Sequence, residues 1–152
     1  MEQAMMMALA KAGGYAAVGL AAIGSSIGTG VAGTSAIGAW KKCYQQDKPA
    51  PFLLLALAGA PLSQTIYGMI MMILISRAAA KTPENWPVYL FVGLFGGLAQ
   101  MFSALFQGRA AAGGCNAFAE TNPGFADYPV ILGVVVNGET QPAACSCTER
   151  CP

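Results

Sequence analysis

The sequence predicts an all-α membrane protein made of two tandem transmembrane helical hairpins, giving four helices of which the fourth is incomplete or altered. Hydrophobic residues make up 55% of the 152 residues and charged residues only 10%, against about 25% charged in an ordinary soluble domain. Residues 12–40, 49–76 and 85–108 contain no Asp, Glu, Lys or Arg. Each of these segments is longer than the roughly 20 residues that cross a bilayer as a helix.

The first predicted helix covers residues 12–40 and follows Lys11. A signal peptide has an apolar core of about 7 to 15 residues, so we interpret this longer segment as a span that is retained. The polar residues 41–49 that follow are rich in Lys. Because positively charged loops tend to stay in the cytoplasm, this loop is predicted to be cytoplasmic.

The second and third predicted helices, residues 49–76 and 85–108, belong to different hairpins. Residues 1–78 form the first predicted hairpin and residues 79–140 the second. The fourth candidate helix is shorter, because the uncharged segment that begins at Tyr128 ends just before Glu139. It is too short to span a bilayer as written.

Composition excludes several classes of function. The formal net charge is +1, so no excess of positive charge indicates binding to nucleic acid. The chain has no His, which removes the usual general base and the commonest metal ligand. Residues 28–33 match the dinucleotide pattern GxGxxG, but they lie inside a predicted span. Residues 24–28 match GxSxG, but Ser26 has no His to activate it.

Glycine and other small residues fill the first predicted helix on several sides. Such helices belong where neighbouring backbones pack closely, on the crowded inside of a bundle or ring. The sequence around Gly30 can be aligned with that around Gly108, which indicates either a duplicated hairpin or chance similarity between two Gly-rich helices. The glycines expected at helix contacts are Gly24, Gly28, Gly30, Gly33 and Gly108.

Polar residues inside the spans mark the candidate site, since polar groups are costly in lipid. Ala60, Ser63, Gln64 and Tyr67 have the spacing i, i+3, i+4, i+7, which places them on one helix face. Their carbonyl, hydroxyl and amide oxygens are suited to a hard cation. Pro61 would also release a helix carbonyl from its hydrogen bond.

Two further polar residues can reach the same depth. If the turn of the second hairpin covers residues 119–127, Gln107 and Glu139 lie at about equal distances from it, and Gln64 lies at a similar depth in the first hairpin. The alternative is that Gln64 and Gln107 only hydrogen bond between helices and bind no ion.

Four segments resemble the proteolipid (K or c) subunit of V/A-type rotary ATPases, and the resemblance covers about residues 14–135. They are GSSIGTGVAG at 24–33, PLSQTIYG at 61–68, FQGRAAAGG at 106–114 and GFADY at 124–128. The resemblance implies a double hairpin that assembles into the membrane rotor ring. Rotation of that ring would carry Na⁺ or H⁺ across the membrane, coupled to ATP hydrolysis or synthesis elsewhere in the complex.

The same resemblance implies an ion site. In the sodium-pumping members, the ion is bound by a backbone carbonyl, a hydroxyl, a Gln and a Tyr of helix two, a Gln of helix three and an essential Glu of helix four. By position these fall on Ala60, Ser63, Gln64, Tyr67, Gln107 and Glu139. Proton-pumping relatives generally lack part of this oxygen set, so the resemblance favours sodium.

The resemblance also implies how the chain is placed in the cell and what it contacts. It implies a multi-pass protein of the cell membrane and a subunit that is not itself an enzyme. It implies no cofactor and no metal beyond the transported ion. The implied partners are copies of the chain in a ring, a membrane stator subunit with an Arg, the central-stalk subunits and lipid, and no nucleic acid.

The fourth helix departs from the family pattern. In the family, Glu-Thr directly follows Gly-Val-Val, whereas here residues 136–138 separate residues 133–135 from Glu139. A three-residue shift turns a side chain by about 60° and moves it by about 4.5 Å. Residues 141–152 form a Cys-rich tail that cannot cross lipid, and its Cys spacing is no standard zinc pattern. A frameshift is one hypothesis for this tail, because the shifted frame can encode an apolar helix.

A second class of function is compatible with the same glycine pattern. The chain could be a structural bundle or pore built from small-residue helices, without ion exchange. Ion binding separates the two hypotheses, because a scaffold has no need of Gln64, Gln107 or Glu139.

Overall fold

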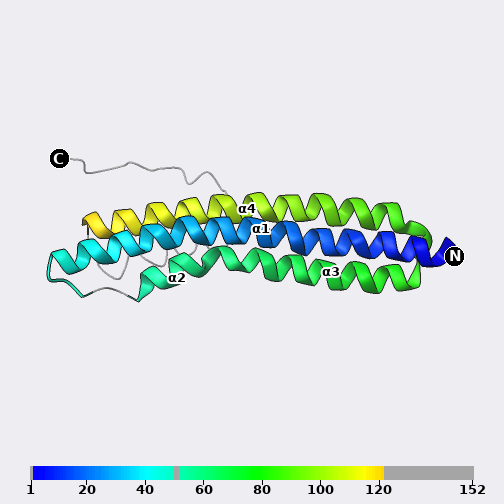
Figure 1. The fold of residues 1–152 in the computed structure, drawn as a ribbon, viewed down its shortest axis with the longest axis horizontal. Coiled ribbons are helices and arrows are strands. Elements are labelled where there is room, and N and C mark those ends of the chain that lie inside the picture. The colour runs from blue at the N-terminus through cyan, green and yellow to red at the C-terminus, as the bar shows by residue number, and fades with distance from the viewer. Residues whose placement is uncertain (1, 50–51, 122–152) are drawn as a thin grey trace, which may run out of the picture.

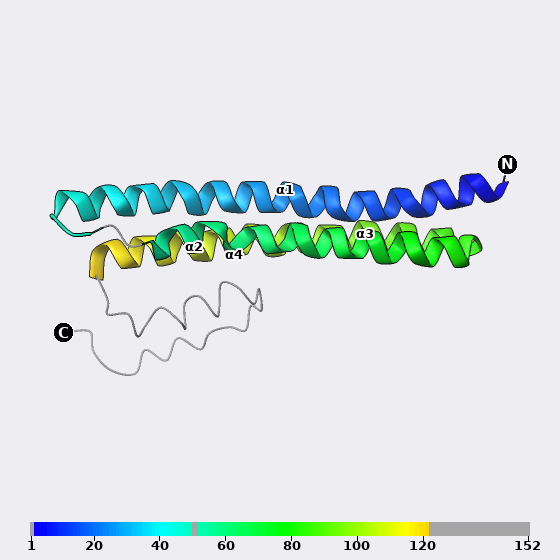
Figure 2. The same cartoon turned by 90° about the horizontal axis from the view of Figure 1, so that it is seen from below.

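The computed structural model describes residues 2–49 and 52–121, which form three helical rods lying side by side (Figures 1 and 2). The first rod is α1, Glu2–Gln45, and the third is α4, Trp86–Thr121. The second rod joins three elements, namely α2 (Leu53–Gly59), η1 (Ala60–Leu62) and α3 (Ser63–Lys81). The short helix η2 (Pro83–Asn85) links this rod to α4.

Each rod is long and apolar enough to cross a membrane. The spans are Glu2–Gln45, Leu53–Lys81 and Pro83–Glu120, and the described residues contain helices but no strand. The all-helical prediction is therefore confirmed for this part of the chain. The predicted fourth helix and the tail lie outside the described residues, so the four-helix arrangement stays a prediction.

The helices extend beyond the charge-free segments that predicted them. α1 continues through Lys41 and Lys42 to Gln45, and α4 passes Arg109 and ends at Thr121. Lys and Arg are good helix formers, so a charge that marks the end of an apolar segment does not end the helix. The assumed turn at residues 119–127 was therefore wrong at its start.

Pro61 interrupts the second rod without breaking it. Proline lacks a backbone N–H and cannot complete a regular helix bond. The chain there forms the 3₁₀ turn η1, and the Ser63 N–H bonds to the Ala60 carbonyl. Gly59, Ala60 and Ser63 all keep right-handed helical dihedrals. The change in bonding therefore lies in the turn just before α3, where the polar side chains begin.

Glycines set the distance between α1 and its neighbours. A Cβ on Gly24 would lie 2.5 Å from the Met101 Cα, and one on Gly68 would lie 2.8 Å from the Ala21 Cβ. Gly28 and Gly108 meet backbone to backbone. Gly14 also meets Met72, so α1 runs parallel to α4 and antiparallel to α3. Such close approach is how helices associate in lipid, where van der Waals packing replaces the hydrophobic effect.

A buried hydrophobic cluster lies at the end of the bundle where α1 and α4 both finish. Leu54, Leu57, Cys115 and Phe118 are buried there against alanines of α1 and α4, with Trp40 packed at the side. Lys42 Nζ lies 4.0 Å from the Glu120 carboxylate at the same end. Both side chains are largely exposed, so this ion pair contributes at most about 1 kcal/mol, and packing holds the two helix ends together.

Asp47 ends α1 in a left-handed conformation, with φ 53°. The N–H of Lys48 bonds to the Cys43 carbonyl at 3.0 Å and that of Asp47 to the Tyr44 carbonyl at 3.2 Å, which is the Schellman pattern of a helix end. Glycine adopts this φ without steric cost. Replacing Asp47 by glycine should therefore stabilise this turn.

We expect Asp47→Gly to raise the free energy of unfolding by about 0.5 kcal/mol, because it removes the strain of a side chain at positive φ. Gln46→Gly is the matched control. Asp47 is the sole non-glycine residue with positive φ in the described part of the chain, so Gln46→Gly should lower stability. Thermal unfolding in detergent measures both, and a drop in melting temperature for Asp47→Gly would contradict this account.

Candidate functional site

Three oxygen atoms converge where η1 meets α3. The Ser63 Oγ lies 3.1 Å from the Ala60 carbonyl oxygen and 3.1 Å from the Gln64 Oε1. A hydroxyl carries one hydrogen, so Ser63 can donate to only one of these two acceptors at a time. The cluster is rich in lone pairs, and such an arrangement suits a hard cation.

Gln64 connects this cluster to α4. Its side chain is 3% exposed, and its Nε2 donates to the Ser103 Oγ at 3.3 Å. Gln107 lies one turn after Ser103 on the same face of α4 and is 4% exposed. The structure therefore brings Gln64 to the turn of α4 next to the one that carries Gln107.

Ser103 did not enter the candidate site predicted from the sequence. It is a single serine in α4, with apolar residues on either side of it in the sequence. Its spacing of four residues before Gln107 is the signal that would have placed it on the Gln107 face. The contact with Gln64 shows that this hydroxyl belongs to the polar cluster.

Helix α1 reaches the same level through Ser25. Ala21 meets Gly68, and Gly28 meets Pro61. Ser25 lies between Ala21 and Gly28 in α1, so the antiparallel register sets it across from Gln64. Its side chain is 2% exposed. All three rods therefore carry a buried polar residue at one level of the bundle.

Tyr67 and Arg109 are exposed, unlike the buried Gln64 and Gln107. Tyr67 lies one turn after Ser63 and is 56% exposed. The central carbon of the Arg109 guanidinium lies over the Phe106 ring, 5.9 Å from the ring centroid. Arg109 lies only two residues from Gln107, but two residues turn a helix by about 200°. The positive charge is thus directed away from the Gln107 face.

Some predicted residues lie outside the described part of the chain, namely Glu139 and the three tail cysteines Cys145, Cys147 and Cys151. The predictions made for these four residues stay untested. Within the described residues, Cys43 and Cys115 are free and buried. No group of three or more Cys, Asp or Glu side chains in that part of the chain could hold a metal ion.

The five glycines expected at helix contacts fall into two groups. Gly24, Gly28 and Gly108 lie against the backbone of a neighbouring helix. A Cβ on Gly30 or Gly33 would meet nothing within 4 Å, so neither glycine packs against the described part of the same chain. Helix geometry explains the difference, because Gly30 is turned by about 200° from Gly28.

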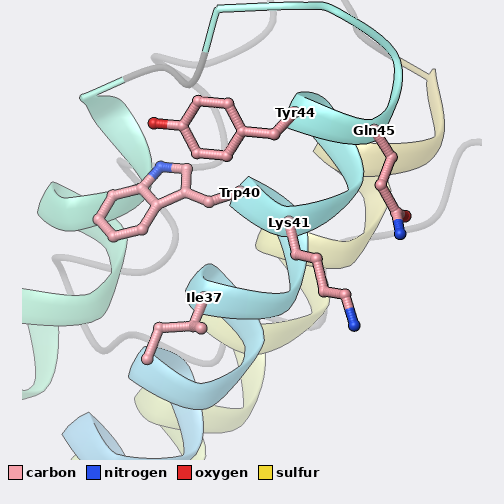
Figure 3. Close-up of a pocket in the computed structure, with 5 residues that line it drawn as sticks. All are labelled: Ile37, Trp40, Lys41, Tyr44 and Gln45. Carbon is pink, nitrogen blue, oxygen red and sulfur yellow. The ribbon is translucent and has the colours of Figure 1, made fainter.

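A shallow groove of about 530 Å³ opens at the loop end of α1, away from the polar cluster (Figure 3). Ile37, Trp40, Lys41, Tyr44 and Gln45 line it. In Figure 3 the Trp40 and Tyr44 rings lie together, with Lys41 and Gln45 on another side of the helix. Tryptophan, tyrosine and lysine are typical of the membrane interface, and this groove contains none of the predicted site residues.

Comparison with known proteins supports the resemblance seen in the sequence. The chain is 36% identical over 115 residues to the A-type ATP synthase subunit K of Methanocaldococcus jannaschii. The match covers 75% of this chain and 49% of the relative, so the chain spans about half the length of the curated relative. No protein-family model matches the chain, and no solved structure matches it.

This match and the three apolar helices describe the same kind of molecule. The relative is by name a subunit of an ATP synthase, and each described rod can cross a bilayer. The chain is a multi-pass membrane protein. Over three quarters of its length, it is homologous to an A-type ATP synthase subunit K.

Proposed function

We propose that this chain is the proteolipid subunit of a membrane rotor ring, which carries Na⁺ across the membrane as the ring turns. The Ser63 hydroxyl, which lies 3.1 Å from both the Ala60 carbonyl oxygen and the Gln64 amide oxygen, carries this proposal. The relationship to a subunit K supports it. The chain is not an enzyme in this proposal, and ATP is hydrolysed or made on other subunits.

Sodium fits the described oxygens better than a proton does. A sodium ion exchanges hydration oxygens for several protein oxygens, whereas a proton needs one carboxylate and a hydrogen-bond partner. The cluster on α3 offers three oxygens, and Gln107 on α4 lies at the same level. The carbonyl, hydroxyl and amides would bind the ion, and no other cofactor is required.

Glu139 is proposed as the carboxylate that makes transport possible. A charged carboxylate is costly in lipid, so the subunit would enter the lipid only when Na⁺ or H⁺ neutralises it. It would release the ion only beside an aqueous half-channel, opposite an Arg of the stator subunit. Transport therefore requires a ring of copies, the stator, the central stalk and the surrounding lipid, because one subunit cannot pump alone.

Carbodiimide labelling tests this proposal, because the reagent attacks protonated carboxyl groups in membranes. We expect Glu139 to be labelled, and Na⁺ to slow the labelling by keeping the carboxylate ionised and occupied. Glu139→Gln should abolish the Na⁺-sensitive label. Glu120, which is 70% exposed in its ion pair with Lys42, is the control for a carboxylate in water.

The proposal fails if labelling of Glu139 responds to neither Na⁺ nor pH. A structural bundle or pore without ion exchange would give that result. Labelling that responds to pH alone would replace Na⁺ by H⁺ as the transported ion.

A further inference from the structure

The Gln64 amide lies between two hydroxyls on different helices. Its Oε1 is 3.1 Å from the Ser63 Oγ of the same rod, and its Nε2 donates to the Ser103 Oγ of α4 at 3.3 Å. The side chain is 3% exposed, so bulk water does not compete for either end of the amide. Its two neighbours therefore determine which end faces the oxygen cluster.

The two ends of an amide are opposite in chemistry. The oxygen accepts hydrogen bonds and binds cations, whereas the nitrogen carries two hydrogens and repels cations. Turning the Gln64 amide by 180° would direct N–H groups at the Ser63 hydroxyl. The cluster would then lose one cation ligand and gain a competing donor.

We propose that Ser103 is a positioning residue for the cation site, a role that rests on the proposed sodium function. Its hydroxyl accepts the Nε2 hydrogen and so holds the Gln64 oxygen toward the Ser63 hydroxyl. Without this acceptor, a buried N–H would lose its partner whenever the oxygen faced the ion. The orientation that binds sodium would then be the less stable one.

The positioning of Gln64 by Ser103 affects the binding of sodium but not the binding of protons. A proton binds at the carboxylate and does not need the Gln64 oxygen. Loss of the Ser103 hydroxyl should therefore lower Na⁺ affinity and leave proton binding by the ring as it was. A general loosening of the helices would change both, which separates positioning from a structural role.

The experiment measures Na⁺ binding to the purified ring of the full chain, by ²²Na⁺ and by Na⁺-dependent slowing of carbodiimide labelling. Ser103→Ala should weaken Na⁺ binding about three- to tenfold, the range expected for one hydrogen bond, and leave the labelling rate without Na⁺ unchanged. Ser103→Thr and Ser103→Val introduce side chains of nearly the same shape, of which only Thr carries a hydroxyl. Only the Thr variant should therefore retain the Na⁺ affinity of the parent ring. Ser26→Ala is the matched control, because Ser26 is exposed and bonds only to its own helix at Ile23.

A double-mutant cycle tests whether Ser103 acts through Gln64. In a Gln64→Leu ring, Ser103→Ala should have no further effect on Na⁺ affinity. Additive effects, equal affinities for the Thr and Val variants, or a changed labelling rate without Na⁺ would each overturn the positioning role while the sodium function stands. A parent ring without saturable Na⁺ binding would overturn the sodium function itself and this role with it.

Discussion

Gly108→Leu is expected to separate α4 from α1 and to prevent the chain from reaching its folded form in the membrane. A Cβ at this position would collide with the backbone of Gly28. Backbone atoms cannot move aside as a flexible side chain can, so we expect a loss of about 3 kcal/mol or more. Protease resistance and thermal unfolding of the detergent-extracted chain measure this loss.

Gly30→Leu is the matched variant on the opposite side of α1. A Cβ there meets nothing within 4 Å, so the fold of the single chain should survive. If the open side of α1 packs against the next copy in a ring, the same variant should block ring assembly, which native mass measurement detects. Equal loss of fold in both variants would contradict the packing described above, and an intact Gly30→Leu ring would place the subunit contact elsewhere.

The sequence could not separate these two groups of glycines. α1 is apolar or small on every side, so its composition has no periodic pattern that would show which side faces a neighbour. Which side of α1 faces each neighbouring helix is shown only by contacts such as Gly24 with Met101 and Gly68 with Ala21. In contrast, the positions of the three rods could be predicted, because long stretches without charge are rare outside membrane helices.

Part of the candidate site could also be predicted from the sequence. Ala60, Ser63 and Gln64 are close in sequence, so helix periodicity alone brings their oxygens to one face. The contact between Gln64 and Ser103 joins residues far apart in the chain. Its prediction would have required the register of α3 against α4, which depends on how glycines and bulky side chains fit together.

The double variant Gln64→Leu with Gln107→Leu is expected to weaken Na⁺ binding by the ring at least about tenfold, or roughly 1.4 kcal/mol. Both amides are buried, at 3% and 4% exposure, so water cannot readily replace the oxygens that are removed. Leucine is close to glutamine in volume, and the packing of α3 against α4 should persist. Na⁺ titration of the purified ring in parallel with carbodiimide labelling measures the change.

Protonation of the carboxyl group should become easier in the double variant, whereas Na⁺ binding becomes weaker. This difference shows whether the two amides bind the ion or only link helices. A cation that binds less tightly competes less with protonation, so in the presence of Na⁺ the carboxyl group should be labelled faster in the double variant. Ser26→Ala, on the exposed side of α1, should change neither measurement. Unchanged Na⁺ affinity in the double variant would mean that Gln64 and Gln107 serve helix packing alone, and that other groups bind the ion. A parent ring without saturable Na⁺ binding would replace sodium by the proton as the transported ion.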